Sequence, residues 1–349
     1  MVLLDKIQMD GLLLFAKKMY FCISKKNGML VSIVIPVFGV SEYIDRCVRS
    51  VMEQTYGDIE CILVDDASPD DSIARCERLI SNYRGHVRFV ILHHGQNRGV
   101  SAARNSGTAA ATGDCVYYLD GDDALPPNSI ERLTRPMLND ATIEMALGNI
   151  ERIPDGYPVA SENRQKLQEE ELTSLEAVRD YYFSRRMLSV TACNKLIRKD
   201  FLEWHQMAFK EGLLYEDNLW SFFMVKHLAH VYIVPEVTYL YYKHPNSITT
   251  GTSKEEEVRH YSVVYEEIAQ HFTPGEEARE AAYFLPDFRL HYQQFPDNPS
   301  FRRTARLFEK ALSITLDEVV WQGGGEEPFG SDTLRLLEVS KGSMSLQFQ

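Results

Sequence analysis

Residues 117–123 read Tyr-Tyr-Leu-Asp-Gly-Asp-Asp, so a run typical of a buried strand stops at three carboxylates within four positions. Like charges this close repel one another unless a cation lies between them. A divalent cation fits, because Mg²⁺ and Mn²⁺ take oxygen ligands and commonly bridge protein carboxylates to substrate phosphates. The alternative is a solvated acidic turn without a ligand, and the Asp-x-Asp pattern alone does not decide between the two.

The segments around this stretch alternate between two patterns. Continuous apolar runs predict strands at Ser32–Ile35 (ended by Pro36), Cys61–Val64, Val87–Leu92, Cys115–Leu119 and Met145–Gly148. Between them, capping patterns at Ser41 and at Ser68 to Asp71, and the small-residue run Val100–Ala111, predict helices. Alternating strands and helices predict an α/β fold, with a mostly parallel sheet flanked by helices.

Acidic clusters follow two strands of this predicted sheet. Asp65-Asp66 come directly after the second strand, and Asp120 to Asp123 after the fourth. In open parallel sheets, ligands bind beyond the carboxyl ends of the strands. We therefore expect both clusters to line one cleft, although more than fifty positions separate them.

The overall composition narrows the class of protein. The chain has 349 residues and a net charge of −13, which argues against a nucleic-acid partner. An anionic substrate would therefore need a metal ion, an arginine or a helix N-terminus. Six cysteines show no zinc or redox spacing and favour small buried side chains in a reducing cytosol. No apolar run reaches the length of a membrane span, and we expect a cytoplasmic location.

The patterns divide the chain into three regions. We expect residues 1–28 to be an extension outside the native chain, because Met29 leads directly into the first strand; a short amphipathic surface helix is the alternative. Residues 29–250 are predicted to form the main domain, with a donor half at 29–150 and an acceptor half at 151–250. Within the second half, residues 162–180 are predicted to be a polar helical connector, and Val231–Val234 and Val237–Tyr242 to be short strands.

The last region, residues 251–349, is predicted to be a helical extension without a catalytic motif. Its segment Phe301–Ala311 carries four basic residues on one face. Such a face can rest on anionic lipid at the inner side of the cell membrane, although a solvated face is more common. Peripheral membrane contact and homo-oligomer formation both stay open.

Four blocks of the chain, in order, resemble the donor half of inverting family 2 glycosyltransferases with the GT-A fold: Val31–Phe38, Leu63–Ser68, Asn97–Asn105 and Tyr118–Asp123. Glu216-Asp217 resembles the later acidic pair of the same family, so the likeness covers about residues 31–248. The resemblance implies metal-dependent transfer of one sugar from a nucleotide sugar, usually UDP-linked. It also implies a polysaccharide or glycolipid acceptor.

The resemblance also implies which residues bind the donor: Pro36, Val37, Phe38, Asp65, Asp66, Arg98, Arg104, Asp120 and Gly121. The first three would line the nucleotide pocket, and Asp65 or Asp66 would accept a hydrogen bond from the base. The two arginines would donate to base or diphosphate, with structural ion pairs as the alternative. Many relatives carry Tyr-Asn where this chain has Phe38-Gly39, which changes the fine nucleotide contacts.

The chemistry of the reaction adds a metal and a base. A departing nucleoside diphosphate gains negative charge, and Mn²⁺ or Mg²⁺ held by Asp122 and Asp123 would stabilise it. Inversion needs a carboxylate to take the acceptor hydroxyl proton, and Asp217 is the candidate, with Glu216 shaping the acceptor side. The plain alternative for this pair is acidic decoration of a helix N-terminus. Lys195 would neutralise carboxylates, contact the acceptor or form a structural ion pair.

Three other functions are compatible with an acidic α/β protein. A sugar nucleotidyltransferase would carry a glycine- and arginine-rich phosphate loop after the first strand, and Val37 to Ser41 offers none. A glycosidase also uses carboxylates, but it does not explain a metal-type cluster. A non-catalytic nucleotide-sugar-binding or assembly subunit stays open. The discriminating feature is whether Asp217 faces Asp122 across one cleft.

Overall fold

The computed structural model describes residues 28–155, 166–245 and 252–313, together with three short strands beyond them. Residues 1–27 of the predicted extension lie outside the described part of the chain. The main sheet has the strand order β3-β2-β1-β4-β7-β5-β8-β6. Its strands are β1 (Val31–Val37), β2 (Ile59–Asp65), β3 (Arg88–His93), β4 (Cys115–Tyr118), β5 (Met145–Pro154), β6 (Glu170–Leu172), β7 (Lys195–Arg198) and β8 (Val231–Lys243). A separate small sheet contains β9 (Trp321–Gln322), β10 (Leu334–Leu336) and β11 (Leu346–Phe348).

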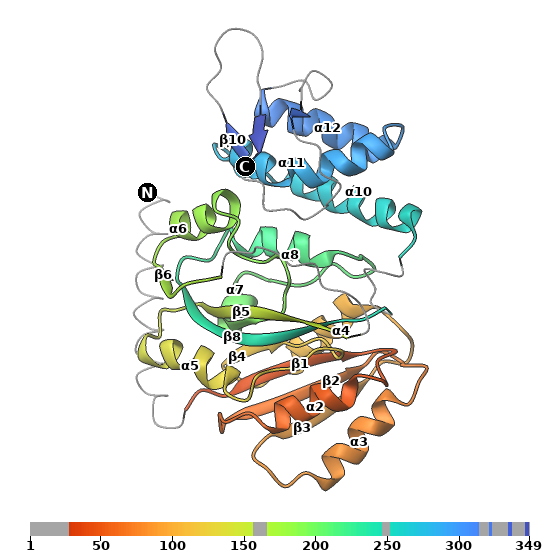
Figure 1. Cartoon of the computed structure of the whole chain (residues 1–349), viewed down its shortest axis with the longest axis vertical. Coiled ribbons are helices and arrows are strands. Elements are labelled where there is room, and N and C mark those ends of the chain that lie inside the picture. The colour runs from red at the N-terminus through yellow and green to blue at the C-terminus, as the bar shows by residue number, and fades with distance from the viewer. Residues whose placement is uncertain are drawn as a thin grey trace, which may run out of the picture.

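The helices flank the main sheet and continue beyond it: α2 (Ile44–Met52), α3 (Ser72–Asn82), α4 (Val100–Ala110), α5 (Ser129–Asn139), α6 (Leu175–Arg179), the π-helical turn η1 (Asp180–Ser184), α7 (Lys199–Trp204), α8 (Glu216–Met224), α10 (Lys254–Gln270), α11 (Glu277–Gln294) and α12 (Pro299–Leu312). Helices α2 and α3 lie together on one side of the sheet, and α4 lies on the other (Figure 1). The strand order explains this arrangement. Strands β2 and β3 add to one side of β1, and β4 then adds to its other side, so right-handed crossovers place α4 on the face opposite α2 and α3. The predicted fold class is confirmed.

Strands β1 to β4 all run parallel to one another. In β1, Ile33 is level with Cys61 of β2 on one side and Tyr117 of β4 on the other, and all three side chains are fully buried. Helices on both faces exclude water, which explains why these strands are continuous apolar runs rather than alternating ones. Asp65 ends β2 and Asp120 follows β4, so both clusters start at the carboxyl edge.

Strand β1 does not end at Pro36 but continues to Val37. The carbonyl of Val34 accepts from Leu119 N–H at 3.0 Å, so Val34 faces β4, and Pro36, two residues on, faces the same side. Pairing with β4 stops at Val34 and Tyr118. The missing N–H of Pro36 therefore points to the side where β4 no longer pairs with β1, and no hydrogen bond is lost there. The pairing of β1 with β2, on the other side, continues through Pro36.

The starts of two helices also differ from the prediction. Helix α2 begins at Ile44 without a side-chain cap, and α3 begins at Ser72 rather than next to Ser68. The side chain of Asp70 explains the shift, because it accepts from Ser72 N–H at 3.0 Å and from Ser41 N–H at 2.9 Å. One carboxylate thus joins the two turns that follow β1 and β2.

The second half of the sheet corrects two further predictions. Val231–Lys243 is one long strand rather than two short ones, and it passes through Pro235. Residues 162–180 were predicted to be a polar helix. Their described part instead contains the edge strand β6, which pairs antiparallel with β8, followed by the short helix α6. Strand β8 lies between β5 and the edge strand β6. Its last part reaches the Asp120–Asp123 turn, where Ala124 and Leu240 form an isolated bridge.

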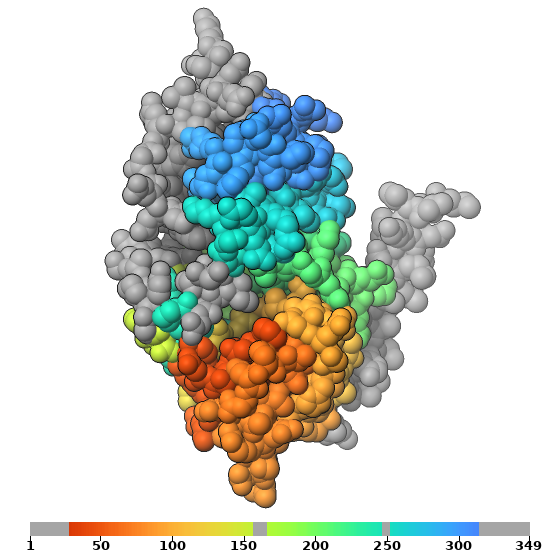
Figure 2. Space-filling model, turned by 90° about the vertical axis from the view of Figure 1, so that its right-hand side faces the viewer, coloured from red at the N-terminus to blue at the C-terminus, as the bar shows by residue number. Residues whose placement is uncertain are grey.

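The C-terminal helices α10 to α12 pack against one another around an aromatic core. Phe288 stacks on Phe308 with ring centroids 4.7 Å apart, and Phe301 meets it edge-on. These helices rest on the segment around α8, at the far end from the parallel strands (Figures 1 and 2). On the predicted basic face, Arg302 pairs with Asp297 and Arg303 with Glu266. No helix in the described part of the chain is long and apolar enough to cross a membrane.

Candidate active site

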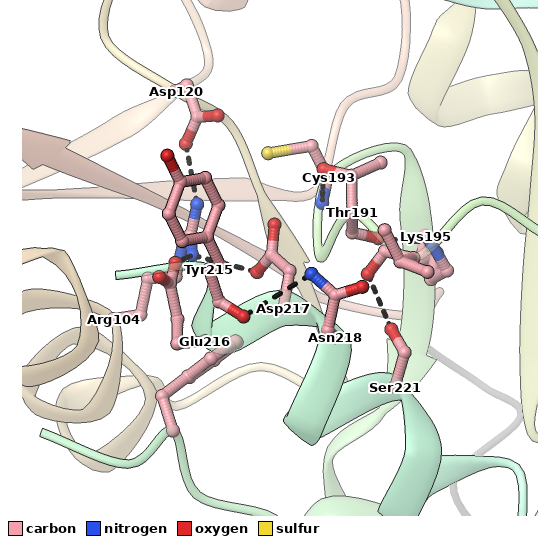
Figure 3. Close-up of polar contacts among 12 residues, drawn as sticks. Arg104, Asp120, Thr191, Cys193, Lys195, Tyr215, Glu216, Asp217, Asn218 and Ser221 are labelled. Carbon is pink, nitrogen blue, oxygen red and sulfur yellow. Dashed lines mark hydrogen bonds and ion pairs between the residues drawn. The ribbon is translucent and has the colours of Figure 1, made fainter. Parts of the chain in front are cut away.

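Arg104 joins carboxylates from three distant parts of the chain. Its guanidinium, on α4, lies 3.0 Å from Asp120 after β4, 2.5 Å from Glu216 and 3.1 Å from Asp217 at the start of α8. Figure 3 shows Arg104 between Asp120 on one side and the acidic pair on the other. The structure therefore brings Asp120 together with the acidic pair Glu216-Asp217, which lies far from it in the chain.

Burial and charge set the protonation of this cluster. Burial alone would lower the pKa of the Arg104 guanidinium. The negative charges of Asp217, Asp120 and Glu216 outweigh burial and raise this pKa well above its usual value, so the guanidinium stays charged. Burial raises the pKa of Asp217; Arg104 opposes the shift and the charge of Asp120 adds to it. Burial likewise raises the pKa of Glu216, with the neighbouring Asp217 adding to the shift. Asp217 remains 21% exposed and keeps access to solvent.

Asp122 and Asp123, the last two carboxylates of the Asp120–Asp123 turn, have different surroundings. Asp123 is 1% exposed, and it accepts from Tyr239 Oη at 2.6 Å and from Tyr242 N–H at 2.8 Å. Burial and the charges of Asp122 and Asp120 raise its pKa to about 9. Asp123 therefore fastens the turn to β8, while Asp122, 28% exposed, is the carboxylate that opens outward.

His244, just after β8, meets Asp122. Its Nε2 lies 2.9 Å from Asp122 Oδ2, and its ring stacks on Tyr43 at 4.1 Å. The imidazole is 3% exposed, and its Nδ1 has no hydrogen-bond partner among the described residues. A carboxylate oxygen suits Mn²⁺ and Mg²⁺, and an imidazole nitrogen is a common ligand of divalent transition metals. Asp122 and His244 therefore fit a divalent cation, whereas the side chain of Asp123 is already engaged.

The backbone of the acidic turn lies close to the end of β1. A side chain at Gly121 would approach the carbonyl of Pro36 to 3.1 Å and the side chain of Val40 to 3.2 Å, so a bulkier residue would push the turn outward. Arg46 of α2 donates to the Asp122 carbonyl at 2.7 Å and lies 3.4 Å from the centre of the Tyr242 ring. These contacts hold Asp122 at the rim.

Asp65 and Asp66 have different surroundings. Asp66 is 2% exposed and accepts from the N–H groups of Arg98 and Gly99 at 2.9 and 2.7 Å, so it fixes the loop before α4. Asp65 accepts from Ser68 N–H and lies 2.9 Å from His93 Nδ1. Of the two predicted base acceptors, Asp65 is therefore the more accessible one.

The remaining predicted donor residues lie near the end of β1 or before α4. Phe38 is 46% exposed, the open aromatic face next to Asp65, while Val37 is fully buried and points into the core. Arg98 forms an exposed pair with Glu211 at 3.0 Å rather than joining the Arg104 cluster. Its guanidinium can therefore leave that pair at small cost.

Lys195 is buried and contacts neither Asp217 nor solvent directly. Its ammonium donates to the carbonyls of Ser189 and Thr191, and burial lowers its pKa to about 8. The loop it holds supplies the Ala192 N–H that hydrogen-bonds to Asp217. These contacts are none of the three that the sequence suggested for Lys195: its ammonium fastens the loop beside the candidate base.

Sequence reasoning missed several supporting residues. Tyr239, Arg46 and Ala192 hold the acidic side chains or their backbone, but they lie on separate elements and share no motif. His244 follows the predicted strand Val237–Tyr242 closely, yet its proximity to Asp122, 122 positions away, depends on where β8 ends. Only the fold connects them.

The fold is of the GT-A type, with a Rossmann-like sheet whose carboxyl edge carries Asp65 and Asp120. Residues 32–204 match the family Glycosyl transferase family 2, so this stretch of the chain is a domain of that family.

Relatives carry compatible names. "Uncharacterized glycosyltransferase EpsJ" of Bacillus subtilis is 29% identical over 224 residues, covering 63% of this chain and 63% of that protein. "Glycosyltransferase GlyG" of Streptococcus pneumoniae is 27% identical, covering 63% of this chain and 72% of its own length. Chondroitin synthase of Escherichia coli is 34% identical over 149 residues, only 21% of that enzyme. The chain thus spans less than two thirds of EpsJ.

Solved structures show the same fold. TarS 1–349 of S. aureus in complex with UDP-GlcNAc superimposes with a TM-score of 0.63 at 16% identity, covering 81% of this chain and 82% of that one. The mannosyltransferase PcManGT of Pyrobaculum calidifontis, in complex with GDP-Man and Mn²⁺, gives 0.54 at 14% identity, covering 86% and 84%. At these identities the likeness concerns the fold alone.

Proposed function

We propose that the protein is a metal-dependent, inverting glycosyltransferase that moves one sugar from a nucleotide sugar, UDP-linked, to a saccharide or lipid-linked acceptor. The observation that carries this proposal is the Arg104 cluster, which joins the turn after β4 to the start of α8. Asp122 lies two residues from Asp120, which supports one cleft for the candidate metal ligand and the candidate base. A solvated acidic turn would not require such a cluster.

The donor side is assigned from exposure and hydrogen bonding. Phe38 would stack on the nucleobase, and Asp65 would accept from its N–H, exchanging His93 for the base. Asp122 and His244 would hold Mn²⁺ or Mg²⁺, which when bound supplies positive charge for the departing diphosphate. Arg98 would add a second cation to the diphosphate after leaving Glu211. Complexes of structural neighbours with UDP-GlcNAc and with GDP-Man and Mn²⁺ support this class of donor.

The acceptor side is assigned to α8 and the loop before β7. Asp217 would take the proton of the acceptor hydroxyl, since it keeps an exposed edge while Ala192 N–H and Arg104 fix its direction. Glu216, nearly buried, would hold Arg104 rather than contact the acceptor. Arg104 would thereby link occupation of the donor side at Asp120 to the position of Asp217.

The pH dependence of turnover follows from the raised pKa of Asp217. The carboxylate is the active form, so activity falls as pH drops through that pKa. Because burial raises the pKa, we expect the acidic limb above about pH 4, the ordinary range of an aspartate. Because Glu216 titrates with Asp217, the limb reports the pair. The measurement is kcat/KM against pH with nucleotide binding followed in parallel; a rate that stays level down to about pH 4 would exclude Asp217 as the base.

A donor screen tests the proposed function as a whole. Purified protein is combined with Mn²⁺ and a panel of nucleotide sugars, and both thermal stabilisation and diphosphate release are recorded. We expect a UDP-linked sugar to stabilise the protein in the presence of Mn²⁺ and much less with chelator. Stabilisation without turnover under any acceptor would favour the non-catalytic subunit, and no stabilisation by any nucleotide would contradict the proposal.

A further inference from the structure

The residue before the candidate base has an unusual backbone. Tyr215 adopts φ +61° and ψ +27°, a left-handed conformation, immediately before Glu216. Bulky residues rarely adopt this conformation, and they keep it only where the surrounding structure fixes it. The turn directs α8 so that Glu216 and Asp217 face Arg104 (Figure 3).

The contacts that fix this turn come from α10. The Tyr215 ring stacks on Tyr261 with centroids 4.2 Å apart and planes 16° apart, and Leu214 N–H donates to His260 Nδ1 at 3.1 Å. Tyr261 in turn lies 4.4 Å from the ring of His291 on α11. Two consecutive residues of α10 therefore hold two consecutive residues of the turn.

The other end of α8 is held by the same helices. Lys226, two residues beyond α8, donates to the carbonyl of His271 and lies 3.8 Å from buried Glu280 of α11. Phe222 of α8 meets Phe284 of α11 edge-on at 5.8 Å. Both ends of the helix that carries the acidic pair are thus fastened to α10 and α11, which lie beyond the residues 32–204 that match the family.

From these contacts we infer that the C-terminal helices are part of the catalytic unit, and that Tyr261 and His260 are positioning residues for Asp217. The inference rests on the proposed function, in which Asp217 is the base. Without the ring of Tyr261, the turn at Tyr215 is free to leave its left-handed conformation. Glu216 and Asp217 then rotate away from Arg104, while the donor residues on β1, β2 and β4 stay in place.

The test compares Tyr261→Ala with Tyr261→Phe, which keeps the stacked ring, and with Val263→Ala, an exposed position on the same helix. We expect Tyr261→Ala to lower kcat about 10- to 100-fold, less than removal of the base, because Asp217 stays present but is misplaced. The donor KM and the stabilisation by UDP and Mn²⁺ should stay within twofold. Tyr261→Phe and Val263→Ala should both behave like the unsubstituted protein. A kcat unchanged in folded Tyr261→Ala, or an equal loss of donor binding, would overturn the inference.

Hydrogen exchange provides a second measurement that does not need activity. Peptides covering residues 213–224 should exchange faster in Tyr261→Ala than in Tyr261→Phe, while peptides of β1, β2 and β4 stay protected to the same extent. Equal exchange in both variants would refute the positioning role, whatever the enzyme assay shows. If the unsubstituted protein releases no diphosphate but the exchange result holds, the proposed function fails and the positioning of α8 stands.

Discussion

Asp217→Asn is expected to lower turnover by about 10²- to 10⁴-fold, the usual contribution of a general base. Asparagine keeps the size of the side chain and can still accept from Ala192 N–H and Arg104, but it cannot take a proton. Stabilisation by UDP and Mn²⁺ should persist, because the donor residues are on other elements. The measurement is steady-state diphosphate release with the best donor of the screen, next to thermal shift with nucleotide.

The matched control for this variant is Glu203→Gln, which neutralises an exposed carboxylate on α7 that pairs only along its own helix. It should leave turnover and nucleotide binding unchanged. If Asp217→Asn retains turnover within a few-fold of the unsubstituted protein while UDP still binds, then Asp217 is not the base. In that case the acidic pair is the decoration of a helix N-terminus that the sequence also allowed.

Arg104→Met is expected to destabilise the protein by about 3 kcal/mol, the lower end of the range for removing one partner of a buried ion cluster. Methionine fills much of the volume but leaves Asp120, Glu216 and Asp217 without the cation between them. The free energy of unfolding is measured by urea denaturation. Turnover should also fall, because nothing then draws Asp217 toward the donor side.

The sign of the pH dependence distinguishes this mechanism from a simple packing loss. Without Arg104, the folded-state pKa values of Glu216 and Asp217 rise further, so protonation stabilises the folded variant. The destabilisation should therefore be largest at high pH and shrink as pH falls through those pKa values. Arg98→Met, which breaks an exposed pair with Glu211, should change stability by less than about 1 kcal/mol at any pH. A loss for Arg104→Met that is small, or independent of pH, would contradict the charge-cluster account.

The parallel half of the fold was predictable because each of its signals is local. Runs such as Ile33 to Ile35 and Cys61 to Val64 are apolar and β-branched because both faces of the sheet are covered. The carboxyl-edge rule then placed Asp65 and Asp120 on one edge from chain order alone. The boundary at Pro36 was wrong because it depended on where the neighbouring strand β4 ends, which no local pattern encodes.

The site was only partly predictable, because pairing between distant side chains decides the role of each acid. Asp122 and Asp123 are equivalent in the sequence, yet Tyr239 and the Tyr242 backbone engage Asp123 while Asp122 stays open. Arg104 was a candidate for the base or diphosphate, with a structural ion pair as the alternative, and the structure pairs it with Asp217, 113 positions away. The turn at Tyr215 carried no sequence signal, because its support comes from Tyr261 on another helix.

The most direct test of the shared cleft is a crystal structure with UDP and Mn²⁺, in which anomalous scattering locates the manganese. We expect one manganese peak bound to Asp122 and His244 and to the diphosphate, with Asp217 facing it across the space for the sugar. A manganese peak away from Asp122, or a bound nucleotide from which Asp217 is turned away, would contradict the account.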